Sequence, residues 1–480
     1  MVSVSAAGRS GGRITLVGQA ARLTLSLVSV ALLSRLLDPA DFGLLAMVTA
    51  FVGVGDIIRD LGLSAAAVQA RTISQFQKSN LFWVNLGVGA SFALICIAAA
   101  PALADLYGSP ELTGIASSLA IVYLLNGLQT QSQAELTRSL RFATLTFTDL
   151  VSFVSGVLVA VLAALAGFGY WALVWQLITQ AIVLCAGRLV AAGWIPSMPR
   201  RNQEMGNLLR FGRDFTLVQL VAYAGNNAQS VIIGPALGAT ALGIYTRAYQ
   251  LYMVPTFQIL GPLTSVAHAT LSRLQDDDEA FNRAVRQTSV LLGYPLALAC
   301  ALVVAMPDQI VAVLLGPGWG EAASVLSILS VGGAILGLNR VLTWVYQARG
   351  LVRAQLRYMI FSRSLIIAAM IAGLTGGISG VALAFTAGTV LAWPLNAFIL
   401  SRTGFATREY WTISFRVLLV SSVVAAAAWA TAIVSADLPA FVQLLLSIPS
   451  SAVVIGVLLL IRPIRADLSF LARALVRRRG

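Results

Sequence analysis

The side chains that most often do chemistry in proteins are scarce in this sequence. It has one histidine, His268, and one lysine, Lys78, which follows Gln77 rather than a glycine-rich loop. These residues cannot supply a histidine metal site, a histidine-containing catalytic triad or a phosphate-binding loop. The carboxylates of QDDDEAF, residues 275–281, are spaced for acid–base chemistry, but acids there are also typical of a solvated helix start. We favour the helix start, and we expect no catalytic residue, no metal site and no cofactor.

Arginines inside apolar segments are more informative. Arg22 and Arg247 each lie several residues inside an apolar run, where a charged side chain either serves a binding site or reaches back to the membrane interface. Both interpretations stay open for these two residues, because the interface is only about 12 Å from Arg22 along a helix and arginine is long. Arg340 and Arg363 lie nearer the ends of their runs, which favours reaching back to the interface.

Two carboxylates also lie inside apolar segments. Asp56 stands three residues before Arg59 in GDIIRD, a spacing that predicts a local ion pair on a helix. Asp149 has no partner at helical spacing. We therefore name Asp149, and after it Asp56, as the candidates for ion coupling, with a structural role as the alternative for both.

Amide side chains form two groups. NGLQTQSQAEL places Asn126, Gln129 and Gln133 along one face of a helix, and a polar stripe of that length predicts a water-filled path rather than a dry helix contact. YAGNNAQS places Asn226 and Asn227 in the middle of another apolar run, where amides that faced lipid would be costly. These two face either a cavity or a neighbouring helix.

The elements that must position these residues are membrane helices. The chain has 480 residues, of which 58% are hydrophobic and 11% charged, about half the charge of a soluble protein. Continuous apolar runs of about 20 residues are long enough to cross a bilayer as helices. We predict an all-α integral membrane protein with fourteen transmembrane helices. The predicted spans are 14–34, 42–63, 81–103, 112–134, 144–166, 170–192, 214–236, 241–265, 288–306, 322–346, 355–374, 378–400, 412–434 and 440–461.

The basic residues predict the orientation and account for the net charge of +13. Arginines gather in alternate loops, such as those around Arg138 and around Arg210, whereas acids such as Asp105 and Asp308 occupy the opposite loops. By the positive-inside rule both termini are cytoplasmic. No soluble domain is available to present a basic face, so nucleic acid is not an expected partner. The tail, residues 465–480, has apolar residues at helical spacing among arginines and is expected to touch anionic headgroups on the inner leaflet.

The chain contains a weak internal repeat. A shift of 200 residues aligns Gln19 with Gln219 and Gly43 with Gly243, and both pairs fall at matching points of their spans. Because six spans separate the copies, the repeat is parallel. It predicts two six-helix lobes, 1–200 and 201–402, around a central cavity, followed by two extra helices and a basic amphipathic tail in 403–480. Both glutamines are expected to line the cavity.

Several segments together resemble a known family. These are SRLLDPADFGLLAM, NLFWVNLGVGAS, LYGSPELTGIASSLAIVYLLNGLQTQSQAELTRSLRF, GYWALVWQ and YTRAYQLYMVPTFQILGPLTSVAHATLSRLQDD. They are similar to the polysaccharide transport family, the lipid-linked oligosaccharide flippases of the multidrug/oligosaccharidyl-lipid/polysaccharide exporter superfamily. The resemblance covers nearly the whole chain and is strongest over 12–290.

The resemblance implies a function. Members move undecaprenyl-diphosphate-linked repeat units across the bacterial inner membrane by alternating access, for capsule, exopolysaccharide or O-antigen assembly. It further implies a cationic cavity that faces the lipid diphosphate, to which we assign Arg22 and Arg247. A polysaccharide polymerase and glycosyltransferases are the implied protein partners.

Three alternatives remain. A multidrug or small-solute exporter would share the fold, but an exporter of cations would carry an acidic cavity. A polysaccharide polymerase or ligase would be an enzyme, and such enzymes usually have a large outer loop that this chain lacks. A scaffold without transport activity is the third.

Overall fold

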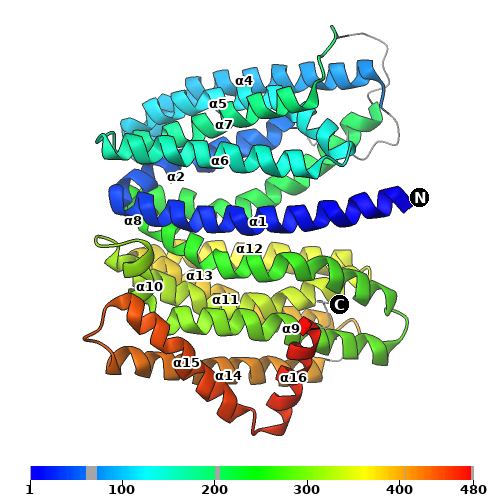
Figure 1. Ribbon diagram of the computed structural model, residues 1–480, viewed down its shortest axis with the longest axis vertical. Coiled ribbons are helices and arrows are strands. Elements are labelled where there is room, and N and C mark those ends of the chain that lie inside the picture. Colours follow the sequence, from blue (N-terminus) through cyan, green and yellow to red (C-terminus); the bar gives the residue numbers. More distant parts are fainter. Residues whose placement is uncertain (1, 61–72, 200–205, 406, 477–480) are drawn as a thin grey trace. The chain divides into compact units, whose positions relative to one another are not determined.

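The structure is a computed structural model that describes residues 2–60, 73–199, 206–405 and 407–476, and within these ranges it contains helices joined by turns and loops, with no strand (Figure 1). The first half of the chain contains α1 (Val2–Leu36), α2 (Pro39–Asp60), α4 (Gln75–Tyr107), α5 (Glu111–Arg138), α6 (Phe142–Leu165), α7 (Trp171–Ala192) and the long α8 (Gly206–Arg273). The remainder contains α9 (Asp278–Ala305), α10 (Pro307–Leu314), α11 (Gly320–Ala348), α12 (Val352–Gly373), the 3₁₀ turn η1 (Leu374–Gly376), α13 (Gly377–Ser401), α14 (Thr407–Val434), α15 (Ala440–Leu458) and α16 (Arg462–Val476).

Over their described residues, the fourteen predicted spans each fall on a helix, apart from at most three residues at an end. The spans 214–236 and 241–265 are the two parts of α8, which breaks at Gly238 (φ 83°, ψ −179°), a conformation that glycine adopts without a steric penalty. Within the described residues, eleven helical segments are long and apolar enough to cross a membrane; the longest, Arg353–Ser401, joins α12 and α13. The prediction of an all-helical integral membrane protein is confirmed.

Local sequence signals define where several helices begin and end. Ser74 caps α4 with its side chain, and Gln77 completes the capping box by accepting from the Ser74 backbone at 2.9 Å. Gly108 and Gly193 end α4 and α7 in the left-handed conformation that glycine favours at this position. Helix α7 has 22 residues, close to the length that a bilayer requires, and α4 has 33, more than enough to cross it.

The two halves of the chain repeat one packing pattern. In the first half α4 packs on α5, α6 on α7, and α5 on α7; in the second half α9 packs on α11, α12 on α13, and α11 on α13. The third to sixth spans of each half therefore pack against the corresponding neighbours. This is the arrangement expected of a parallel repeat.

Glycines mark the repeat at atomic detail. A Cβ added at Gly43 would overlap the carbonyl oxygen of Ala239, and a Cβ added at Gly243 would overlap that of Pro39. Adding 200 to the residue numbers of Pro39 and Gly43 gives Ala239 and Gly243, so the 200-residue shift found in the sequence converts one contact into the other. The start of α2 and the middle of α8 thus cross at backbone contact, which only glycine permits.

The chain divides into two compact units, 1–243 and 244–480, within α8. Residues 206–243 belong to the first unit because the first part of α8 contacts α2 and α4. The Tyr223 hydroxyl donates to the Thr49 carbonyl at 3.0 Å, and the Tyr107 hydroxyl donates to the Ser230 carbonyl at 3.5 Å. The lobes 1–200 and 201–402, and the cavity between them, stay predictions from the repeat.

The C-terminal helix is attached to the second unit by a buried ion pair. Asp467, 3% exposed on α16, accepts from Arg416 Nη1 of α14 at 2.6 Å and from the Tyr294 hydroxyl of α9 at 3.3 Å. Leu468 and Leu471 pack against the same cluster. Both leucines are partly buried by this contact. Contact of the tail arginines with anionic lipid stays a prediction.

Candidate functional site

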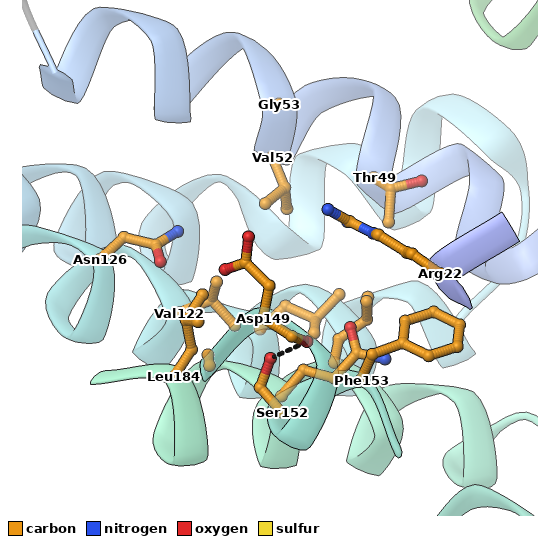
Figure 2. Close-up of a pocket in the computed structure, with 14 residues that line it drawn as sticks. Arg22, Thr49, Val52, Gly53, Val122, Asn126, Asp149, Ser152, Phe153 and Leu184 are labelled. Atoms are coloured by element: carbon orange, nitrogen blue, oxygen red, sulfur yellow. Dashed lines mark hydrogen bonds between the residues drawn. The ribbon is translucent and has the colours of Figure 1, made fainter. Parts of the chain in front are cut away.

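A cavity of about 330 Å³ lies within the first unit. Its walls come from five helices: Arg22 from α1; Thr49, Val52 and Gly53 from α2; Leu119, Val122 and Asn126 from α5; Asp149, Ser152 and Phe153 from α6; and Leu177, Gln180, Ala181 and Leu184 from α7. Figure 2 shows Arg22 of α1 and Asp149 of α6 reaching into the same space from neighbouring helices. The lining is mostly apolar with a few charged and polar groups, which is typical of a ligand site.

Arg22 supplies an accessible positive charge to this cavity. Its side chain is exposed, and within the described ranges it makes no hydrogen bond or ion pair. An arginine in this state can offer its planar fork of donors to a phosphate group.

Within the described part, Asp149 has no side-chain partner on its own helix but pairs with a neighbouring helix, and its role in ion coupling stays a prediction. Arg188 of α7 forms a salt bridge of 2.7 Å from Nη2 to Asp149 Oδ1. The pairing could not be read from helical spacing, because the partners are 39 residues apart on neighbouring helices. Arg188 is only 6% exposed, so its charge depends on this partner.

Arg188 also anchors the amide stripe of α5. Its Nη1 group donates to Gln129 Oε1 at 2.8 Å and to Gln133 Oε1 at 2.7 Å. The Gln129 amide in turn donates to Asn126 Oδ1 at 2.8 Å. Asn126 lines the cavity and Gln133 is exposed, whereas Gln129 is buried between its two hydrogen-bond partners. The water-filled path along this stripe stays a prediction.

The polar contacts that begin at the Arg188–Asp149 salt bridge and continue through Gln129 and Asn126 end at Asp56. Asn126 Nδ2 donates to both of its carboxylate oxygens, at 3.1 and 3.2 Å. The predicted partner Arg59 has a side chain outside the described part, so that pairing stays a prediction. A continuous chain of polar contacts therefore runs from Asp56 on α2, through α5, to Arg188 on α7 and Asp149 on α6.

Two tyrosines fit against the glycines of α2. A Cβ at Gly53 would overlap the ring of Tyr223, and a Cβ at Gly55 would overlap that of Tyr123. The Tyr123 hydroxyl donates to the Val52 carbonyl at 2.9 Å. These contacts hold the cavity-facing side of α2 close to α5 and α8.

The second unit has a polar contact between the same helices of its repeat, but a neutral one. Asn339 of α11 donates from Nδ2 to the Tyr358 hydroxyl of α12 at 2.8 Å, and Asn396 of α13 donates to Asn339 Oδ1 at 2.6 Å. In the second unit, hydrogen bonds between two asparagines and a tyrosine thus connect the helices that correspond to α5, α6 and α7. In the first unit, the Arg188–Asp149 salt bridge connects α6 and α7.

The remaining predicted arginines lie in the second unit. Arg247 is half-buried and donates from Nη1 to Gln250 Oε1 at 2.6 Å. Arg340 and Arg363 are both exposed, and their charges act on each other and on Tyr358. That they reach back to the interface stays a prediction.

The other predicted polar residues are less informative. Gln19 and Gln219 have exposed side chains, and neither lines the 330 Å³ cavity. Asn227 Nδ2 donates to the Tyr223 carbonyl one turn earlier at 3.0 Å, so this amide satisfies the backbone of its own helix. The side chain of Asn226 lies outside the described part. Cavity roles for these residues stay predictions.

Arg188 is the functional candidate that sequence reasoning missed. The available signal was an arginine inside a predicted span, 170–192, only a few residues from its end. At that place an arginine is usually explained by reach to the interface. Only the packing of α6 against α7 reveals the carboxylate that it binds.

Curated relatives share most of the chain. The lipopolysaccharide biosynthesis protein WzxC of Escherichia coli (strain K12) is 23% identical over 413 residues, covering 84% of this chain and 82% of the relative. The succinoglycan biosynthesis transport protein ExoT of Rhizobium meliloti (strain 1021) is 28% identical over 315 residues, covering 65% of this chain and 63% of the relative. Both names concern bacterial cell-surface polysaccharides.

Solved structures share the fold. The lipid II flippase MurJ, in an inward closed conformation, matches with a TM-score of 0.70 at 13% identity and covers 92% of this chain and 98% of its own. An inward-facing multidrug resistance MATE family transporter of the MOP superfamily matches with a TM-score of 0.62 at 18% identity. The match covers 80% of this chain and 94% of the transporter. The sequence profile of the polysaccharide biosynthesis protein family matches residues 32–324, more than half of the chain. The chain belongs to the polysaccharide biosynthesis protein family.

Proposed function

We propose that this protein is a flippase that moves undecaprenyl-diphosphate-linked oligosaccharide units across the bacterial inner membrane by alternating access. The observation that carries the proposal is Arg22, an accessible cation in a cavity enclosed by five membrane helices. An unpaired charge at this depth costs about 2.5–3.5 kcal/mol on the insertion scale. Such a cost is expected where an anionic cargo uses the charge.

The size of the cavity suits one part of that cargo. Its volume of about 330 Å³ is at the lower end of the ~300–1,000 Å³ range of small-molecule sites. It can take a diphosphate but not a whole oligosaccharide. The first unit would then bind the diphosphate, while the sugars occupy the predicted cavity between the lobes and the isoprenoid chain stays in lipid.

The names of the relatives and neighbours agree with this cargo. WzxC, ExoT and the lipid II flippase MurJ are named for polysaccharide or lipid-linked precursor handling. A transporter needs no reaction at the site, which agrees with a sequence that offers so few catalytic groups. We further propose that a polysaccharide polymerase and glycosyltransferases act beside it, and that the arginines of the tail contact anionic headgroups.

The proposed orientation places both termini in the cytoplasm, and reporter thiols test it. Cysteine at Glu111 or Thr375 should react with a membrane-impermeant reagent in intact cells, because both positions are exposed in loops expected outside. Cysteine at Ser139, beside Arg138 and Arg141, should react only after permeabilisation. The parent protein, with its three native cysteines, is the control. Labelling of the Ser139 variant in intact cells would contradict the proposed orientation and place this loop outside.

Depletion of the protein tests the function directly. We expect lipid-linked oligosaccharide to continue to be made, to accumulate on the inner leaflet, and to stop reaching the surface polymer. The measurements are mass spectrometry of the lipid intermediate and its accessibility to an impermeant glycosidase in inside-out and right-side-out vesicles. Restored expression of the wild-type gene is the control.

The same experiment separates the alternatives. Unchanged amounts of surface glycan and of lipid-linked intermediates would contradict the proposed flippase function. Normal flipping with loss of the polymer would favour a polymerase. Increased sensitivity to cationic dyes, with normal glycan, would favour the multidrug exporter whose fold the chain shares.

A further inference from the structure

We propose that Arg188 is a positioning residue that holds Asp149 away from Arg22, and thereby keeps the cavity cation available to an anionic ligand. The inference rests on the proposed function, because it concerns the same diphosphate site. It assigns Arg188 an indirect role: the arginine acts on the ligand through Asp149 and does not contact it.

The geometry of the cavity creates the need for such a residue. Arg22 and Asp149 both line it and reach into the same space (Figure 2). An arginine and an aspartate that share a cavity of low polarity attract each other strongly. If they paired, the cavity would lose its positive charge and its free donors.

The structure gives Asp149 a different partner. The salt bridge to Arg188 is 2.7 Å long, and two further hydrogen bonds to Gln129 and Gln133 hold the guanidinium in place. Arg22 and Arg188 repel each other electrostatically, so the two cations do not exchange places easily. Asp149 is therefore occupied, while Arg22 makes no hydrogen bond or ion pair with any described residue.

The other carboxylate of the network is occupied in the same way. Asp56 is not part of the cavity lining, and both of its oxygens accept from Asn126. The amides of α5 thus accept from Arg188 at one end, which holds it beside Asp149, and donate from Asn126 to Asp56 at the other. The lining itself contains one cation, Arg22, and one anion, Asp149. With Arg188, which pairs with Asp149 from outside the lining, the three charges sum to one positive charge.

The second unit shows that the fold does not need a charged pair here. Asn339, Tyr358 and Asn396 join the corresponding helices through hydrogen bonds between neutral groups, and none of the three side chains forms an ion pair with a described residue. A buried ion pair is commonly no more stabilising than neutral side chains of similar volume. The charges of Arg188 and Asp149 therefore need a reason other than helix packing, and control of the charge beside Arg22 provides one.

The test compares the two partners of one salt bridge, with farnesyl diphosphate as the probe and farnesol as its uncharged control. Arg188→Gln should weaken binding of farnesyl diphosphate to the purified full-length protein by at least about tenfold, because Asp149 is released to pair with Arg22. Asp149→Asn should instead strengthen binding, because the lining gains a positive charge. The double variant should return to near the wild-type affinity, since its net charge equals that of the wild type.

A merely structural salt bridge would behave differently. Both single variants would then lower the melting temperature and the affinity in the same direction. Arg416→Gln breaks a comparable buried pair, Arg416–Asp467, in the second unit, and it should leave the affinity unchanged. Arg22→Ala should abolish the difference in affinity between farnesyl diphosphate and farnesol, both alone and in combination with the other substitutions.

Each outcome decides one question. Equal binding of both probes by the wild type would contradict the proposed function itself. Wild-type discrimination that Arg188→Gln leaves intact would overturn the role of Arg188 alone. If Arg188→Gln cannot be recovered as folded protein, the double variant still decides: retained binding supports the indirect role, and lost binding means that Arg188 contacts the ligand.

Discussion

Arg22→Ala and Arg247→Ala are each expected to lower transport by at least about tenfold while leaving expression and membrane insertion intact. Arg22 acts in the cavity of the first unit, where it has no hydrogen-bonding or ion-pair partner among the described residues. Arg247, held by Gln250, is the cation assigned to the second lobe, where the repeat position in the first lobe is the apolar Met47. The measurement is surface glycan in a null strain that expresses each variant at matched levels.

Lysine substitutions and a surface control refine this test. Arg22→Lys and Arg247→Lys should recover only part of the activity, because lysine keeps the charge but loses the planar fork that binds phosphate oxygens. Arg402→Ala is the control, since Arg402 is exposed at the end of α13 and stacks over Phe398. Full complementation by Arg247→Ala would show that this arginine is only a structural anchor.

Gly43→Val should prevent correct folding, with a loss of stability above about 3 kcal/mol. Its Cβ would overlap the backbone of Ala239, and neither helix can move away without breaking the crossing of α2 and α8. Gly243→Val should be equally damaging, because its Cβ would overlap the carbonyl of Pro39. Size-exclusion profiles and thermal unfolding in detergent measure the effect.

Gly87→Val is the matched control for this pair. Gly87 also lies within a membrane helix, but it is exposed and a Cβ there would contact nothing within 4 Å. The control should keep the wild-type profile, apart from the small cost of a β-branched residue in a helix. Wild-type stability of Gly43→Val would mean that the close crossing of α2 and α8 is absent from the folded protein.

The sequence by itself determined the elements and their order. Each apolar run of about 20 residues must satisfy its own backbone in lipid, so it must be a helix, and the fourteen predicted spans fall on helices over their described residues, apart from at most three residues at an end. The 200-residue shift also located Gly43 and Gly243, which the structure places at one reciprocal crossing. Arg22 was recognisable as a candidate because a charge inside an apolar run is costly.

Only the tertiary structure decided how the polar residues are paired. Asp149 looked unpartnered because helical spacing reveals neighbours three or four residues away, whereas Arg188 reaches it from the adjacent helix. The stripe of Asn126, Gln129 and Gln133 was visible in the sequence, but only the packing shows that Gln129 is buried and hydrogen-bonded to Asn126 and Arg188. A lone polar residue in lipid must find a partner, but the sequence does not say which of several helix faces will supply it. That choice depends on helix rotation and packing, which are set by the whole set of contacts between helices.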